Sequence, residues 1–142
     1  MTPKKELSLL KGHIQSDLER SKKHLEFSFE KCKKIIQNQS LSEENLESLE
    51  SFSSRFARYS DIVVSRYFRA LAIELDPAFR GSVIDLLNIA EKNKWIASAK
   101  EWTVIRELRN IAAHEYEAED YVALYKELLK LTPTLLQVST SL

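Results

Sequence analysis

The chain has 142 residues, of which 44% are hydrophobic and 30% are charged. This length favours one domain with a core of its own, and the composition fits a soluble globular protein. Only two glycines and three prolines occur, which leaves few turn signals and argues against a many-stranded sheet. The formal net charge is zero, so no overall positive field attracts nucleic acid.

Features that report on location point to the cytoplasm. Cys32 is the single cysteine, which rules out an internal disulfide and suits a reducing compartment. It falls among the regularly spaced apolar positions of this segment, which favours a small core residue over a nucleophile. Lys4 and Lys5 lie near the N-terminus, and no apolar run approaches the roughly 18 residues that a membrane span needs. We therefore expect a cytoplasmic protein without a signal peptide and without membrane contact.

The first predicted helix covers about residues 4–37, where apolar side chains recur at three- and four-residue steps. The line that we expect to be buried is Leu10, Ile14, Leu18, Ser21, Leu25, Phe29, Cys32 and Ile36. Turn-prone side chains interrupt it, and Ser42 is the predicted N-cap of a second helix over about 43–75. Asp76 and Pro77 end that second helix.

Three shorter helices are predicted in the rest of the chain. One covers about 82–92, and the next covers about 98–114 and opens with the capping-box spacing of Ser98 and Glu101. The last covers about 119–137, and Pro133 is expected to end or kink it. Short connections between these helices predict one all-α domain over 1–142, an up-and-down bundle of four to five helices.

The charges of the N-terminal half are unevenly distributed. A lysine cluster is followed by an acidic run: Lys22, Lys23, Lys31, Lys33 and Lys34, then Glu43, Glu44, Glu47 and Glu50. We favour a solvated helix face for both groups. The alternative is a lysine stripe that faces phosphate groups.

The fourth predicted helix carries most of the residues with chemical potential. At about 100° per residue, its buried side is expected to hold Val104, Ile105, Leu108, Ile111 and Ala112. Arg106, Asn110 and His114 follow at four-residue steps along the polar side. Arg109 lies between the two sides, so this helix alone does not bring Arg109 and His114 together. A second protomer or the second helix would have to complete a site.

Arginine and histidine together suit phosphate chemistry. The guanidinium of Arg109 presents a fork of donors that matches phosphate oxygens. An imidazole such as that of His114 exchanges a proton near neutral pH. It can therefore deprotonate a ribose 2′-hydroxyl or protonate the leaving oxygen. The pair therefore can support RNA cleavage without a metal. From these residue types alone, an exposed or structural role is favoured over catalysis.

A longer motif changes this weighting. Arg109, His114 and Tyr116 form the pattern Arg-x4-His-x-Tyr, with Ile105 to Asn110 before it and Glu115 within it. This string resembles the signature of HEPN proteins, in particular the toxin-like members that are paired with minimal nucleotidyltransferases. The predicted helices resemble the same fold, so the likeness covers most of the chain by architecture and about eight residues by motif.

The resemblance implies a function and a set of partners. It implies a homodimer in which Arg109 and His114 of both protomers meet in a cleft, with Asn110 orienting the site. The activity would be metal-independent endoribonuclease cleavage of RNA, with no cofactor. Tyr116 would be modified with adenylate by a minimal nucleotidyltransferase antitoxin. The alternative is a non-catalytic accessory or substrate-binding subunit of a nucleotidyltransferase, and the sequence leaves both open.

The second helix has an unusually polar side around Arg55, Arg58 and Asp61. We favour an ion pair between Arg58 and Asp61, which are one turn apart. In the alternative, this side contributes to an RNA cleft, with Arg106 as a further contributor.

The remaining candidates have structural interpretations. His13 and His24 are expected on the surface, and the three histidines lack the spacing of a metal site. Trp95 and Trp102 are expected to fill the core between the third and fourth helices.

Overall fold

The structure is a computed structural model that describes residues 3–114 and 121–138. In these ranges 82% of the chain is helical and no strand occurs. The elements are α1 (Pro3–Ile35), α2 (Glu43–Asp61), the π-helix η1 (Ile62–Phe68), α3 (Arg69–Leu75), α4 (Val83–Lys92), α5 (Ala99–His114) and α6 (Tyr121–Leu136). The predicted all-α bundle is confirmed.

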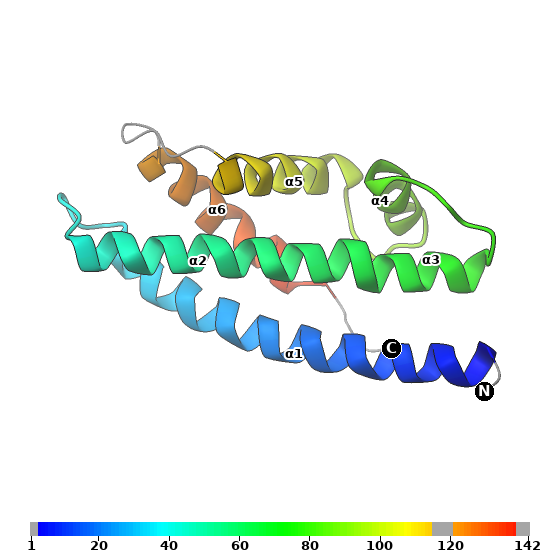
Figure 1. Cartoon of the computed structure of the whole chain (residues 1–142). Helices are drawn as coiled ribbons and strands as arrows, with labels where there is room; N and C mark the ends of the chain where they lie inside the picture. The colour runs from blue at the N-terminus through cyan, green and yellow to red at the C-terminus, as the bar shows by residue number, and fades with distance from the viewer. Residues whose placement is uncertain (1–2, 115–120, 139–142) are drawn as a thin grey trace.

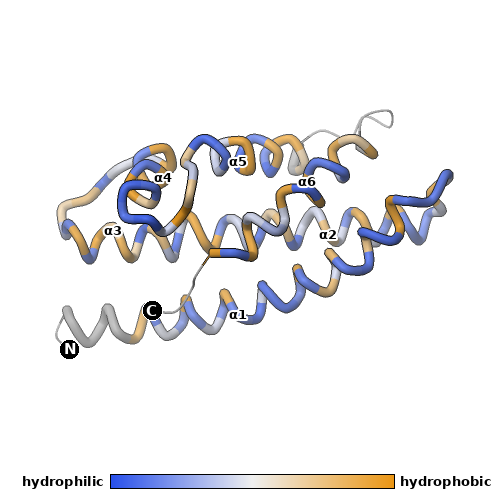
Figure 2. Tube along the Cα trace, turned by 180° about the vertical axis from the view of Figure 1, so that it is seen from behind, coloured by the Kyte–Doolittle hydropathy of each residue, from blue (hydrophilic) through white to orange (hydrophobic). Residues whose placement is uncertain are grey.

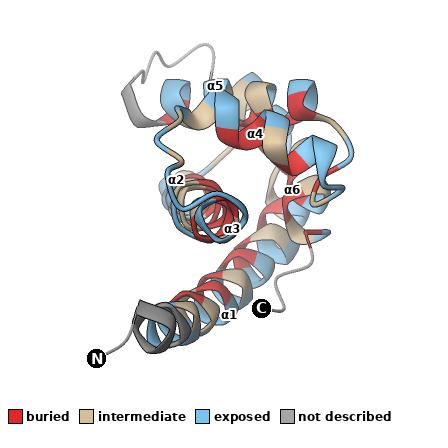
Figure 3. Cartoon of the chain, turned by 90° about the vertical axis from the view of Figure 1, so that its right-hand side faces the viewer, coloured by how far each residue is buried: buried red, intermediate tan, exposed pale blue. Residues whose placement is uncertain are grey.

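The segments α2, η1 and α3 form one continuous rod that lies in the middle of the bundle (Figure 1). The rod contacts α1 on one side and α4 and α5 on the other, as the end-on view in Figure 3 shows. α6 packs against α1, α2 and α5. Polar and apolar positions alternate along each trace in Figure 2, as expected for amphipathic helices around one core.

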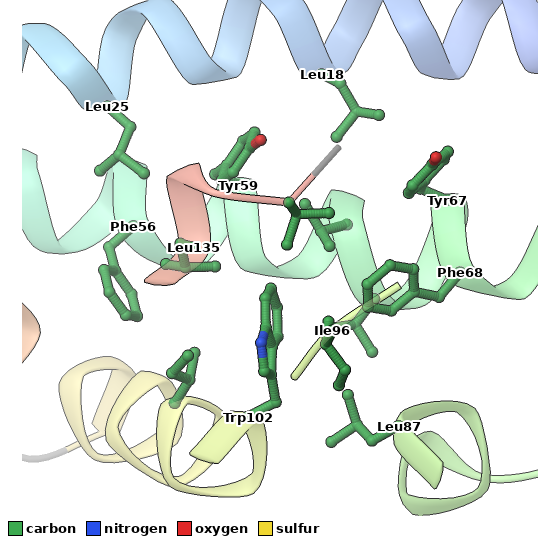
Figure 4. Packing of buried hydrophobic residues seen from close by; sticks show 14 of the residues in the cluster. Leu18, Leu25, Phe56, Tyr59, Tyr67, Phe68, Leu87, Ile96, Trp102 and Leu135 are labelled. Carbon is green, nitrogen blue, oxygen red and sulfur yellow. The ribbon is translucent and has the colours of Figure 1, made fainter. Parts of the chain in front are cut away.

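Aromatic side chains of the central rod bind both layers together. Tyr59 and Tyr67 point towards α1, whereas Phe56 and Phe68 point towards α5 (Figure 4). The ring of Phe68 lies 5.8 Å from that of Trp102, which is almost fully buried. Burial of these large rings stabilises the contact between the layers through the transfer of apolar surface out of water. The core role predicted for Trp102 is therefore confirmed.

Helix ends follow the predicted caps. The Ser42 hydroxyl accepts a hydrogen bond from the Asn45 backbone N–H at 3.1 Å. Ser82 and Asp85 form a capping box at the start of α4. At α5, the Ser98 hydroxyl accepts from the Glu101 N–H, but the Glu101 carboxylate accepts from Thr134 of α6 at 2.6 Å. Only the Ser98 half of the predicted capping box is therefore observed, and the Glu101 carboxylate connects α5 to α6 instead.

Several details differ from the prediction. The second helix is interrupted by seven residues of π-helix, whose wider turn buries two adjacent pairs, Val63 with Val64 and Tyr67 with Phe68. Pro133 lies inside α6, which continues to Leu136, so it does not end that helix. Leu10, predicted to be buried, is 47% exposed.

The predicted buried side of α5 is partly wrong. Ile105 and Ala112 are buried as expected, but Val104 is 41% and Ile111 is 42% exposed. The rod, α4 and α6 cover only one side of α5, so an apolar stripe is left on its outer side.

No helix in the described ranges is both long enough and apolar enough to cross a lipid bilayer.

Candidate functional site

A groove of about 790 Å³ lies between the central rod and α5. Its rod wall carries Ser54, Arg58, Asp61 and Ser65, which recur at four-, three- and four-residue steps along one face of α2 and η1. Its α5 wall carries Arg106, Arg109 and Ala112. The small side chain of Ala112 keeps the α5 wall low and leaves the space between the walls open.

Asp61 connects the two walls of the groove. The Arg109 Nε donates to one carboxylate oxygen at 3.1 Å, and the Arg109 Nη2 donates to the other at 2.8 Å. This side-on fork is the strongest geometry of an arginine–carboxylate pair. It fixes the direction of a long side chain that would otherwise sample many rotamers.

Arg106 donates to the same carboxylate at 2.6 Å. The two arginines are one turn apart on α5, and their repulsion is offset by the shared Asp61. Two guanidinium groups on one carboxylate leave a net positive charge in this cluster. The hydrogen bonds that Arg109 donates to Asp61, together with the negative charge of Asp61, raise the pKa of Arg109, while partial burial opposes them, so Arg109 is always charged.

The donors of Arg109 are only partly used. A guanidinium has five N–H hydrogens, and Asp61 accepts two of them. The Oδ1 atom of Asn110 accepts a third from Nη1 at 3.3 Å. One hydrogen on each terminal nitrogen remains, and 27% of the side chain is exposed. Arg109 can therefore bind an anion end-on without releasing Asp61.

The ion pair predicted between Arg58 and Asp61 is wrong. Asp61 pairs with Arg106 and Arg109 across the groove, because its carboxylate faces α5. Within the described ranges, Arg58 forms no ion pair and no side-chain hydrogen bond, although it is exposed and lines the groove. The alternative interpretation, in which this side of the second helix contributes to a cleft, agrees with the geometry of Asp61.

Two motif residues fall at the edge of the described chain. His114 is the last residue of α5, and its side chain lies outside the described part, as does the whole of Tyr116. His114 follows Arg109 by five positions, which corresponds to about 140° around the helix and about 7.5 Å along it. The two positions therefore lie on different sides of the helix.

The other candidates lie away from the groove. Arg55 donates to the Ser28 hydroxyl and to the His24 carbonyl oxygen, and so connects α2 to α1. Cys32 is buried, and burial raises the pKa of its thiol to about 11. None of the lysine cluster lines the groove, so that cluster does not supply its positive charge.

Metal ligands are not grouped in the described ranges, where no three His, Cys, Asp or Glu side chains lie together.

The sequence predicted Asp61 as the ion-pair partner of Arg58 and, in the alternative, as a contributor to a cleft. Its spacing from Arg106 and Arg109 carries no signal, because 45 and 48 residues separate them. The available signal was the acidic residue itself, in a polar stretch between Phe56 and Ile62. Comparison with models of protein families, with curated proteins and with solved structures finds no match to this chain.

Proposed function

We propose that this chain is a HEPN-type, metal-independent endoribonuclease that acts as a homodimer. The observation that carries the proposal is the state of Arg109, which is held by Asp61 at an open groove with two donors still available. Donors that are fixed in advance stabilise charge on a phosphate more effectively than mobile ones, because no reorganisation is needed during the reaction.

The proposed chemistry needs only side chains of the motif. His114 accepts the proton of a ribose 2′-hydroxyl, and the 2′-oxygen attacks the adjacent phosphorus. The bond from phosphorus to the 5′-oxygen breaks, and the imidazolium of the second protomer's copy of this histidine protonates that oxygen. The products are a 2′,3′-cyclic phosphate and a 5′-hydroxyl. Arg109 binds the phosphate oxygens as charge develops, and Asp61 acts as a positioning residue.

Two features support a dimer. Positions 109 and 114 lie about 140° apart around an α-helix, so a second copy of α5 is the simplest way to bring both groups to one phosphate. The exposed stripe of Val104 and Ile111, with Leu108 between them, provides an apolar surface on the same helix. Burying this stripe would remove the largest apolar exposure of α5.

Tyr116 gives the proposed enzyme a control point. It follows the motif histidine by two residues, so an adenylate on its hydroxyl would place a phosphate near the proposed cleft. That negative charge repels the substrate phosphate and competes for Arg109. The partner that attaches adenylate would be a minimal nucleotidyltransferase acting as antitoxin.

Cleavage of RNA in excess EDTA by the purified protein tests this proposal. We expect cleavage that leaves a 2′,3′-cyclic phosphate, and its loss in His114→Ala but not in His13→Ala, which removes a histidine of α1. Absence of cleavage, or equal cleavage by His114→Ala, overturns the proposal. Co-purification with a nucleotidyltransferase without any cleavage would indicate the accessory-subunit alternative.

A further inference from the structure

The groove contains polar groups that the proposed reaction does not use. The rod wall carries the Arg58 guanidinium and the hydroxyls of Ser53, Ser54 and Ser65. In the described part of the chain, none of these four side chains has a hydrogen-bond or ion-pair partner, whereas Asp61, Arg106 and Arg109 are all engaged. The groove is therefore divided into a paired half and an unpaired half.

The unpaired half has the composition of an anion site. Ser54 and Arg58 are one turn apart, and Ser65 lies two turns further along the same face. Hydroxyls and guanidinium groups are the donors that proteins use to hold phosphate oxygens without reading sequence. Exposed side chains of this kind are often solvated, but here they share one concave surface with Arg109.

The charge of the groove agrees with an anionic ligand. Four arginines and a single aspartate line it, although the whole chain has a formal net charge of zero. Arg66 at the far end pairs with Asp17 of α1 at 2.7 Å, so its charge is already compensated. Arg58 is the groove arginine without a carboxylate partner among the described residues, and it lies about 4.5 Å of helix rise before Asp61.

We propose that Arg58, with Ser54 one turn before it, binds a backbone phosphate neighbouring the one held by Arg109, and that the substrate enters the groove as single-stranded RNA. This inference rests on the proposed function. A groove of about 790 Å³ has the size of a small-molecule site. It accepts a few nucleotides of a flexible single strand, whereas a duplex cannot splay its bases or its backbone into so small a space.

Binding measurements on a cleavage-blocked protein test the proposal. In the His114→Ala background, Arg58→Gln should weaken binding of a short fluorescent oligouridylate by roughly tenfold, the loss of one charge-assisted contact. The slope of log affinity against log salt should fall by about 0.7, the value for one phosphate contact on a single strand. Ser54→Ala should lower the affinity without changing that slope.

The matched control is Arg80→Gln. Arg80 is exposed and bonds only to the neighbouring carbonyl of Phe79, so this change removes the same charge away from the groove. Equal effects of Arg58→Gln and Arg80→Gln overturn the subsite. Binding of a blunt RNA duplex as tight as that of the single strand overturns the choice of substrate.

The two proposals fail in distinguishable ways. Arg58-dependent binding by a protein that never cleaves RNA keeps the subsite and removes the ribonuclease. Cleavage with unchanged KM in Arg58→Gln, in the chain that retains His114, keeps the ribonuclease and removes the subsite.

Discussion

Replacing the Asp61 carboxylate by an amide removes a single negative charge from the point where the two walls of the groove meet. Arg106 and Arg109 then repel each other without compensation, and Arg109 loses one half of its fork. Asp61 is 36% exposed, so we expect a stability loss of at most about 1 kcal/mol. Misplacement of the guanidinium should nevertheless lower kcat by about 100-fold.

The direction of KM separates this positioning role from a general loss of structure. Asp61→Asn makes the groove more positive, so KM for RNA should stay the same or fall while kcat falls. Asp61→Glu should recover part of kcat. The control Asp17→Asn breaks the pair with Arg66 and should leave kcat unchanged. Parent-like kcat in Asp61→Asn would show that Arg109 does not need this partner.

Cys32 is a buried group whose deprotonation destabilises the folded state. Burial raises the pKa of its thiol from 9.0 to about 11, so the unfolded chain loses this proton at lower pH than the folded chain. The stabilising contribution is therefore complete below pH 9 and is lost as pH rises towards 11. We expect the difference in unfolding free energy between the parent and Cys32→Ala to narrow over that interval, as urea unfolding measures. A difference that does not change with pH contradicts this assignment.

At the scale of elements, the caps determine where helices begin. Ser42→Ala removes the acceptor for the Asn45 N–H at the start of α2, and should cost about 1 kcal/mol. Ser16→Ala, an exposed position inside α1, is the control and should be neutral or slightly stabilising because alanine favours helix. Urea unfolding followed by far-ultraviolet circular dichroism compares the two. A loss in Ser16→Ala as large as in Ser42→Ala would remove capping as the cause.

The sequence predicted the positions of the helices better than the contacts between them. Apolar steps of three and four residues located every helix, and Ser42 and Ser98 marked two of their starts, because these signals are local. The π-helix was missed, since its apolar pattern also fits an α-helix. The contacts of Asp61 were missed because pairing between helices depends on how the rod turns relative to α5.

Exposure on α5 was missed for a related reason. A helical wheel ranks Val104 and Ile111 by their apolar character, but burial depends on which neighbours cover the helix. The rod and α6 cover too narrow an arc to enclose both residues.

At the scale of the whole molecule, a substitution on the exposed stripe of α5 can test whether two copies of the chain form a dimer. Ile111→Asp places a charge on the stripe, which should convert the dimer into a monomer and abolish RNA cleavage. Light scattering measures the first effect, and a cleavage assay measures the second. Ile84→Asp on α4, where the side chain is 63% exposed, is the matched control and should change neither. A monomeric parent, or a dimer that survives Ile111→Asp, contradicts a pairing of two copies through α5.

The π-helix has a consequence for how this chain tolerates length changes. A π-turn holds one residue more than the α-helical turn it replaces, and each residue of an α-helix turns the chain by about 100°. A single-residue deletion in 62–68 would allow an uninterrupted α-helix, but only by rotating α2 against α3. Phe56 and Ala72 could then not both remain in the core. Insertions and deletions here should therefore be far more damaging than substitutions, because the segment sets the phase between the groove and the far end of the rod.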